Sequence, residues 1–489
     1  MVSFKDWYRA LCFMIPILAV LERPDMPKAM LGIPGANPFN FMLVMILMGW
    51  FLQRKRQHQT WGQSATINFL LLSYAIVGII GFLRMYFDND GVGEIYTNLG
   101  IEVPNGTAII KDQFINVFKW TIPGLLICYG ATTPQRFNWM VFSILLAGML
   151  LALQIIKNMV PALISGEDIG ARALRVLGRD IGYHRVDLSP LMASVSWAFF
   201  FFSSNFKGGI LRFAALSGFL MAALAMILTG GRLGFVSWLV LGLIIAIVRY
   251  RKLLIVGPLL VITLIPLLPG VQERLFEGFD SETHESLQSE KLDTIDSEGR
   301  DTYAITSGRI VVWPLVLEKI WESPYFGYGM NAMMRAGVVN MVHDLIGQWG
   351  FAHPHNAYLE LVLDAGIIGA LPILCFFAVL LFKARPRFFA LENPVEYQAA
   401  ALVIAFVLIQ LIASFGGQSF YAREGVALMW CSIGLFLSTL KKDRMLVVNA
   451  AETTGDVPVP DLRQRWQQSK ESRFDPKTAF LKQNFSKEE

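Results

Sequence analysis

The sequence has few charged residues for its length. Of its 489 residues, 16% are Asp, Glu, Lys or Arg, whereas soluble domains carry about 25%. Hydrophobic residues make up 54%, and the mean hydropathy is +0.48. This composition excludes an ordinary soluble globular protein. The formal net charge of +4 is too small to indicate a nucleic-acid partner.

Cysteine is also scarce. The four cysteines lie far apart, each within an apolar run, and no CxxC pair or Cys/His ligand spacing occurs. A disulfide framework and a structural zinc site are therefore not expected, and we predict no metal and no cofactor. No small-residue cleavage site follows the first apolar run. We interpret that run as a retained helix rather than a signal peptide.

The hydrophobic residues fall in runs of roughly 17–25 residues, the length that spans a bilayer as a helix. They show no strand-like alternation, so helices are the expected spanning structure. We predict an all-α integral membrane protein with about twelve transmembrane helices and a large helical extracytoplasmic loop. The predicted spans are 6–21, 38–52, 67–86, 113–130, 137–159, 188–206, 210–229, 233–248, 253–269, 356–382, 398–416 and 424–440.

This pattern divides the chain into four parts. Residues 1–269 hold the first nine spans, 270–355 form the long loop domain, 356–440 hold the last three spans, and 441–489 form a polar cytoplasmic tail. The beginning of the long loop is acidic and rich in Ser and Thr, so residues 277–301 are expected to be a flexible linker. The remainder, 307–350, is expected to be helical, with helices over 310–321 and 331–348.

Lys and Arg gather in alternate loops, which places both termini in the cytoplasm and the long loop outside. Three predicted outer loops break this rule by carrying arginine. One loop holds Arg172, Arg175 and Arg179 at helical spacing, so a helix would align them on one face. Arg232 and Arg423 lie in the other two. Fixed positive charge on the outer side suggests an anionic ligand there.

Two histidines, His353 and His355, lie where the long loop meets an apolar helix. A neutral imidazole at a membrane surface can take a proton from a hydroxyl group. We predict that His355 is a general base and that Asn356 orients its ring. The alternative is a capping or interfacial histidine. A metal held by His353 and His355 is disfavoured, because no third suitable ligand lies nearby in the sequence.

Arginine binds phosphate through a bidentate fork and stays charged at any relevant pH. Glycines at 230, 231 and 234 leave space around Arg232, so we predict that it binds phosphate, together with Arg309 and the face formed by Arg172, Arg175 and Arg179. Anchoring to lipid headgroups is the alternative for each arginine, and it suits Arg185 and Arg423 best. Glu360 and Asp364 lie inside a predicted span and are either functional or ion-paired with an arginine.

Several of these residues carry a family resemblance. The stretch 309–331, reading RIVVW…ESPYFGYGMN, followed by HPHN and GIIG, resembles the O-antigen ligase and polymerase superfamily. The family's histidine motif is His, then Asn, Ser or Gln, a spacer of nine residues, and Gly-x-x-Gly. His355-Asn356, the spacer 357–365, Gly366 and Gly369 match it. The turn LTGGR, which ends at Arg232, resembles the family's Ser/Gly-Arg turn.

The resemblance implies a metal-independent glycosyltransferase of the bacterial inner membrane, with its catalytic loop in the periplasm. Its donor would be a saccharide on undecaprenyl diphosphate. Its acceptor would be lipid A core in a ligase, or a lipid-linked repeat in O-antigen or exopolysaccharide polymerisation. Membrane lipids would surround the spans, and a chain-length regulator or export protein is a candidate partner.

Two other functions fit the span number. A peptidoglycan polymerase would share the lipid carrier but would be expected to use an outer-loop aspartate rather than a His-Asn motif. A polysaccharide transporter or flippase would place its charges at mid-membrane on broken helices. The concentration of charge on the predicted outer side favours the glycosyltransferase.

Overall fold

The structure is a computed structural model, and the residues described are 5–27, 29–30, 33–34, 37–54, 61–89, 91–204, 206, 208–264, 308–347, 349–390, 392–417 and 420–453. The predicted acidic linker 277–301 lies outside these residues, as does the tail beyond Thr453. By its contacts the chain divides into a large unit, Met1–Thr439, and a second unit, Leu440–Glu489. Everything below concerns the first unit.

Within the described residues, six helices are long and apolar enough to cross a membrane, and three shorter apolar helices accompany them. The protein is a multi-pass membrane protein built of helices, and each of these nine coincides with a predicted apolar run. The count of twelve spans stays a prediction. The six are α4 (Ala65–Phe87), α9 (Pro134–Ser165), α11 (Arg185–Ser203), α12 (Gly209–Leu228), α21 (Ala357–Phe389) and the continuous run of α22 (Pro394–Val403), η5 (Ile404–Leu408) and α23 (Ile409–Ala413). The three are α2 (Trp7–Met14) with η1 (Ile15–Ala19), α3 (Pro38–Gln53) and α13 (Arg232–Val248).

The predicted span 113–130 is not one continuous helix. Its residues belong to a chain of short pieces, one of which is a π-helix. Pro123 lies in the first turn of the last piece and Thr121 donates its hydroxyl to Phe118 O at 2.8 Å, so the helix restarts there. The pieces are α6 (Gly106–Ile109), the π-helix η2 (Ile110–Ile115), α7 (Asn116–Lys119) and α8 (Ile122–Gly130).

The remaining elements are short or lie between the spans. The strands β1 (Ala29–Met30) and β2 (Ile33–Pro34) pair antiparallel. The others are α5 (Val92–Asn98), α10 (Ile169–Val176), the π-helix η3 (Leu177–Ile181), α14 (Leu253–Leu264), α18 (Arg309–Glu322), α19 (Ala332–Arg335), α20 (Val338–Ile346), η6 (Glu424–Val426) and α24 (Ala427–Thr453).

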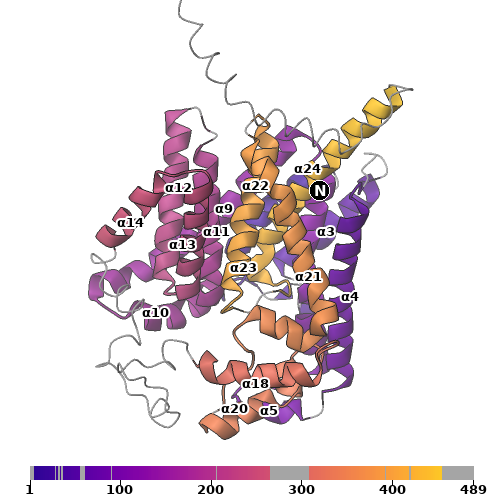
Figure 1. The fold of residues 1–489 in the computed structure, drawn as a ribbon, viewed down its shortest axis with the longest axis vertical. Helices are drawn as coiled ribbons and strands as arrows, with labels where there is room; N and C mark the ends of the chain where they lie inside the picture. Colours follow the sequence, from indigo (N-terminus) through magenta and orange to yellow (C-terminus); the bar gives the residue numbers. More distant parts are fainter. Residues whose placement is uncertain are drawn as a thin grey trace, which may run out of the picture. The chain divides into compact units, whose positions relative to one another are not determined.

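Helix α11 lies among α9, α12, α13 and η5 and contacts all of them (Figure 1). Most of its side chains are buried. Glycines on the neighbouring helices bring them close, because a Cβ at Gly148 would lie 2.5 Å from Val195 and one at Gly218 would lie 2.7 Å from Phe199. Small residues at helix contacts are the usual means of close packing in membranes. Helix α21 contacts α4 and α22 in the same unit.

The described part of the long loop forms a small helical layer of its own. Helices α18 and α20, with α5, lie together at the lower end of the view in Figure 1. Their core is apolar and includes Val312, Val316, Val339 and Val342. The predicted helix 331–348 is divided into α19 and α20, because Gly337 takes a left-handed φ of 75° between them.

Candidate functional site

The predicted general base lies in a constrained loop just before α21. His355 has φ 51°, in the left-handed region that non-glycine residues seldom adopt. The indole of Trp313 on α18 donates to Pro354 O at 3.0 Å, which fixes the loop to the helical layer. The rings of His353 and His355 meet edge-on, with centroids 4.4 Å apart. Two imidazoles are thus held together at the end of a membrane helix.

The side chain of Asn356 caps α21, and its predicted role in orienting the His355 ring stays a prediction. Its Oδ1 accepts hydrogen bonds from Tyr358 N at 3.0 Å and Leu359 N at 3.2 Å, so it is the N-cap of α21. The next residue is tied to the neighbouring span, since Ala357 N donates to Ser414 O at 2.8 Å. The cap fixes where the helix begins, and this places His355 on the last residue outside it.

Arg232 and Arg309 each open a helix, α13 and α18 respectively, and both are half-buried. Arg309 Nη2 donates to Gly416 O at 3.1 Å, across 107 residues of sequence. Burial and then the positive charge of the neighbouring Arg232 lower the pKa of the Arg309 guanidinium. The structure therefore brings together Arg232 and Arg309, two of the arginines predicted to bind phosphate.

Nearby positive charge lowers the pKa of both histidines. Burial, together with the charges of Arg309 and His184, lowers the pKa of His355 to about 4. Burial also lowers the pKa of His353 to about 3, with contributions from His355, Arg423 and His184. Both rings are consequently neutral at neutral pH. A neutral imidazole beside several cations can accept a proton, whereas a charged one could not.

Sequence reasoning missed His184 and assigned Arg185 to lipid anchoring. His184 is the N-cap of α11, and its partial burial lowers its pKa. Arg185 follows it, and its Nη1 donates to Gly170 O at 3.2 Å, close to where a Cβ on Gly230 would lie. The signal that could have found them is a His-Arg pair directly before a predicted span on the side where the other arginines lie.

The predicted arginine face is divided. Arg172 and Arg175 both pair with Glu167, the former at 2.7 Å. Arg179 pairs instead with Asp180 at 2.7 Å and is largely exposed. The helical spacing fails because α10 ends at Val176 and continues as the π-helix η3, which changes the rotation per residue. The charge of these three arginines is offset by neighbouring carboxylates.

Arg423 also has a carboxylate partner, since its Nη2 donates to Asp187 Oδ1 at 2.7 Å. Its charge nevertheless contributes to the low pKa of His353. It therefore lies at the edge of the histidine and arginine cluster rather than serving only as a lipid anchor. We call His184, Arg185, Arg232, Arg309, His353 and His355 the cationic cluster.

Helix α21 begins just after the histidines and is interrupted at Gly366, whose backbone is not helical (φ 62°, ψ −178°). The loop after α18 crosses the gap and pairs with the freed backbone. Tyr328 N donates to Leu363 O at 2.8 Å, Gly329 N donates to Asp364 O at 2.7 Å, and Ile367 N donates to Pro324 O at 2.9 Å. Non-helical backbone inside a membrane protein is tolerated where protein satisfies it in this way.

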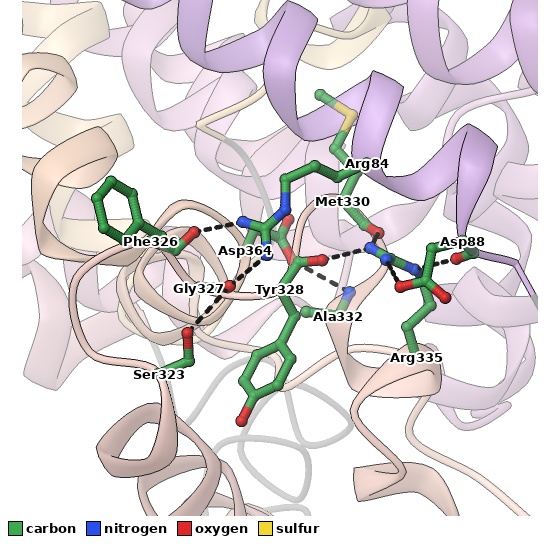
Figure 2. A network of polar contacts seen from close by, with 10 residues as sticks. All are labelled: Arg84, Asp88, Ser323, Phe326, Gly327, Tyr328, Met330, Ala332, Arg335 and Asp364. Carbon is green, nitrogen blue, oxygen red and sulfur yellow. Dashed lines mark hydrogen bonds and ion pairs between the residues drawn. The ribbon is translucent and has the colours of Figure 1, made fainter.

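Figure 2 shows how side chains hold the crossing loop. Arg84, near the end of α4, donates to Phe326 O at 2.6 Å and to Gly327 O at 2.7 Å. Arg335 donates to Tyr328 O and pairs with Asp88. The family-like Ser-Pro-Tyr-Phe-Gly-Tyr-Gly-Met-Asn stretch is thus a structural clamp on the broken helix.

The two predicted carboxyl candidates point into one cavity. Asp364 is only 3% exposed, and its Oδ1 accepts a hydrogen bond from Ala332 N at 3.1 Å. Glu360, one turn earlier, lines the same cavity of about 280 Å³. Among the described residues, no group of three His, Cys, Asp or Glu side chains is arranged to hold a metal ion.

A family model described as O-Antigen ligase matches residues 217–374, a segment that contains Arg232, Arg309, His355 and Gly366. Over this segment the chain is similar to the O-antigen ligase family. A Rickettsia conorii protein whose name makes it a candidate polysaccharide ligase is 31% identical over 124 residues, 24% of this chain and 29% of that protein. This chain therefore aligns with less than a third of its curated relative.

Proposed function

We propose that the protein transfers a saccharide from undecaprenyl diphosphate to an acceptor hydroxyl at the periplasmic face of the bacterial inner membrane. The acceptor is lipid A core or a lipid-linked repeat. The observation that supports this most directly is the neutral, half-buried imidazole of His355. The positive charge of Arg309 lowers the pKa of this imidazole, and the charge of Arg232 in turn lowers the pKa of Arg309. A proton acceptor and a phosphate-binding surface are the two parts that the reaction requires.

The proposed reaction is a single displacement. The acceptor oxygen attacks the anomeric carbon while its proton passes to a ring nitrogen of His355. The bond between the anomeric carbon and the phosphate oxygen breaks, and that electron pair leaves with undecaprenyl diphosphate. Attack opposite the leaving group inverts the anomeric configuration. Arg232 and Arg309 stabilise the charge that grows on the diphosphate, and no metal is required for this.

The low pKa of His355 fits a base that becomes strong only when the donor is bound. A base with a pKa of about 4 is a weak proton acceptor at neutral pH. A bound diphosphate brings negative charge to the arginines whose field lowers that pKa. Offsetting this field raises the pKa of His355 towards its ordinary value near 6.5. Donor binding thereby prepares the base for the acceptor.

The test is glycan transfer by the purified full-length protein, using a synthetic prenyl-diphosphate glycan and alternative acceptors. His355→Asn is the most informative variant, because Asn tolerates the left-handed backbone at this position but is not a comparable base. His343→Asn is the matched control, since His343 lies on α20 and stacks on Trp349 with centroids 4.1 Å apart. We expect His355→Asn to abolish transfer and the control to retain it. Normal transfer by His355→Asn would remove the base assignment.

A further inference from the structure

A cavity of about 280 Å³ lies beside the first turns of α21, the helix that begins just after His355, and its lining differs in charge from the cationic cluster. Its walls come from the π-helix η2, the residues before α19, the first turns of α21 and the residues before η6. Four carboxyl groups line it, from Asp112, Glu360, Asp364 and Glu424, with the single guanidinium of Arg423. The amides of Gln113, Asn116 and Asn331 complete the polar lining.

This lining is suited to hydroxyl groups rather than to phosphate. Ionised carboxylates only accept hydrogen bonds, and side-chain amides both donate and accept. A sugar hydroxyl can match either kind of group. Arg423 gives the cavity little free positive charge, because it already pairs with Asp187 at 2.7 Å. Burial raises the pKa of Glu424, so the repulsion of a phosphate or another anion rests mainly on the other carboxyl groups of the wall.

A tyrosine and a carboxyl group lie side by side in the wall. The buried hydroxyl of Tyr421 is next to Asp364. Burial and then the charges of Asp364 and Glu360 raise the pKa of Tyr421, and a hydrogen bond with Asp364 adds to this. A ligand hydroxyl in the cavity would meet a pair of groups that can both donate and accept hydrogen bonds.

The cavity also lies where an acceptor would need to be. Arg423 forms part of its wall and contributes to the low pKa of His353, whose ring lies against His355. The arginines that suit a diphosphate lie in the cluster with these histidines, whereas the carboxyl groups are gathered in the cavity. The donor diphosphate and the acceptor sugar could therefore bind in two separate places, the donor at the arginines and the acceptor at the carboxyl groups. His355 belongs to the cluster that contains the arginines.

We infer that the carboxyl-lined cavity binds one sugar ring of the acceptor glycan, either neutral or carrying an amine, and excludes anionic sugars. This inference rests on the proposed glycan transfer, since it assigns the second substrate of that reaction. The cavity volume is close to the lower end of the roughly 300–1,000 Å³ typical of ligand pockets, which suits a single ring rather than a chain of sugars.

The first experiment measures binding without catalysis. Saturation-transfer NMR on the full-length protein in nanodiscs would use methyl glucoside, methyl glucosaminide and methyl glucuronide as probes. We expect the first two to bind and the glucuronide not to. The variant Asp112→Asn with Glu360→Gln should weaken binding of the glucosaminide about tenfold, as the loss of charged hydrogen-bond acceptors implies. Binding unchanged by these substitutions, or preference for the glucuronide, would overturn the inference.

Asp344→Asn is the matched control, because Asp344 lies on α20 with its side chain 82% exposed. Thermal unfolding in the same nanodiscs shows whether each variant is folded. Should the double variant unfold, Glu360→Gln alone carries the test, and unaltered binding of the glucosaminide by that single variant would overturn the inference.

The second experiment separates acceptor from donor. Transfer is measured with lipid A core and with a prenyl-diphosphate-linked repeat as acceptors, and the one that is used identifies the source of the sugar ring. We expect the double variant to raise the KM for that acceptor about tenfold with the donor KM unchanged. A rise confined to the donor KM would assign the cavity to the donor and overturn the inference. Activity of His355→Asn would instead contradict the proposed function, while leaving glycoside binding by the cavity intact.

Discussion

At the scale of single residues, the site depends on imidazoles kept neutral by burial and by nearby cations. Burial is the larger cause for both His353 and His355, and the surrounding positive charges add to it. The same arrangement that makes a histidine a poor base in the free protein makes it responsive to a bound anion. His355 also occupies a left-handed backbone conformation, a kind of local strain that clusters at functional sites.

The pH dependence of transfer should reflect the lowered pKa of His355. Because His355 must be neutral to act as a base, activity is lost as pH falls through its pKa. With a pKa of about 4, kcat/KM should fall less than about twofold between pH 7.5 and pH 5 through this group, whereas an ordinary histidine would cause a fall of about 30-fold. The acid limb of kcat, which reports the donor complex, should lie at higher pH. Measuring both profiles checks this, and a kcat/KM limb near pH 6.5 would contradict it.

Arg232 should not be replaceable by lysine. A guanidinium presents a planar fork that matches phosphate oxygens, whereas an ammonium is a point charge. We expect Arg232→Lys to lower kcat by about 10²-fold, the size of effect seen when one preorganised donor to a developing charge is lost. Arg212→Lys, an exposed arginine on α12, is the control and should retain activity. Single-turnover transfer assays would measure both, and full activity of Arg232→Lys would indicate lipid anchoring instead.

At the scale of elements, the broken helix α21 decides where the site residues lie. Its first segment begins at the Asn356 cap, carries Glu360 and Asp364 into the cavity, and ends at Gly366. The crossing loop then fills the gap and is held by Arg84 and Arg335. Gly366 therefore lies at a backbone crossing, in which no side chain can be accommodated.

Gly366→Ala should destabilise the fold strongly. A Cβ at this position would lie 2.2 Å from the backbone carbonyl of Tyr325, and φ is +62°. Gly337→Ala is the matched control, since Gly337 also has a positive φ but nothing within 4 Å of the added Cβ. We expect the control to lose about 1 kcal/mol from left-handed strain and Gly366→Ala to lose at least about 3 kcal/mol. Chemical unfolding in detergent would compare them, and equal losses would show that the crossing loop yields easily.

Arg84 should stabilise the same crossing. Arg84→Met would leave Phe326 O and Gly327 O without their guanidinium donors. Gly327 O keeps the Ser323 hydroxyl as a donor at 3.2 Å, so the cost falls mainly on Phe326 O and is about 1–3 kcal/mol if that carbonyl stays buried. We therefore expect faster proteolysis within residues 323–329 and reduced transfer activity, both restored in part by Arg84→Lys. Cleavage rates equal to those of the wild type would show that the backbone pairing with α21 holds the loop alone.

At the scale of the whole molecule, the proposed function requires the cationic cluster to face the periplasm. The distribution of Lys and Arg predicts this orientation. In a variant without the four native cysteines, Asp344→Cys should react with a membrane-impermeant maleimide in cells with a permeabilised outer membrane. Arg385→Cys, exposed at the far end of α21, should react only after the inner membrane is opened. The reverse labelling pattern would place the cluster in the cytoplasm and exclude the proposed donor chemistry.

The sequence allowed much of the fold and part of the site to be predicted. Apolar runs of bilayer length marked the nine apolar helices, because burial in lipid demands continuous hydrophobic segments. His355, Arg232 and Arg309 were named as candidates from their positions, from neighbouring glycines and from the family resemblance, and their roles stay predictions. The breaks in α21 and near η2 were not predicted, because hydropathy does not register where another part of the chain supplies the missing hydrogen bonds.

The sequence by itself determined that this chain is a helical membrane protein, with arginines and two histidines on one predicted side. Only the tertiary structure decided which of them meet. Arg309 reaches Gly416 across 107 residues, Arg423 reaches Asp187 across 236, and Arg172 and Arg175 turn to Glu167. Periodicity carries information about neighbours within a few turns of one helix. The charge of a site and its cavity depend on contacts between helices far apart in the chain, and these arise only when the helices pack.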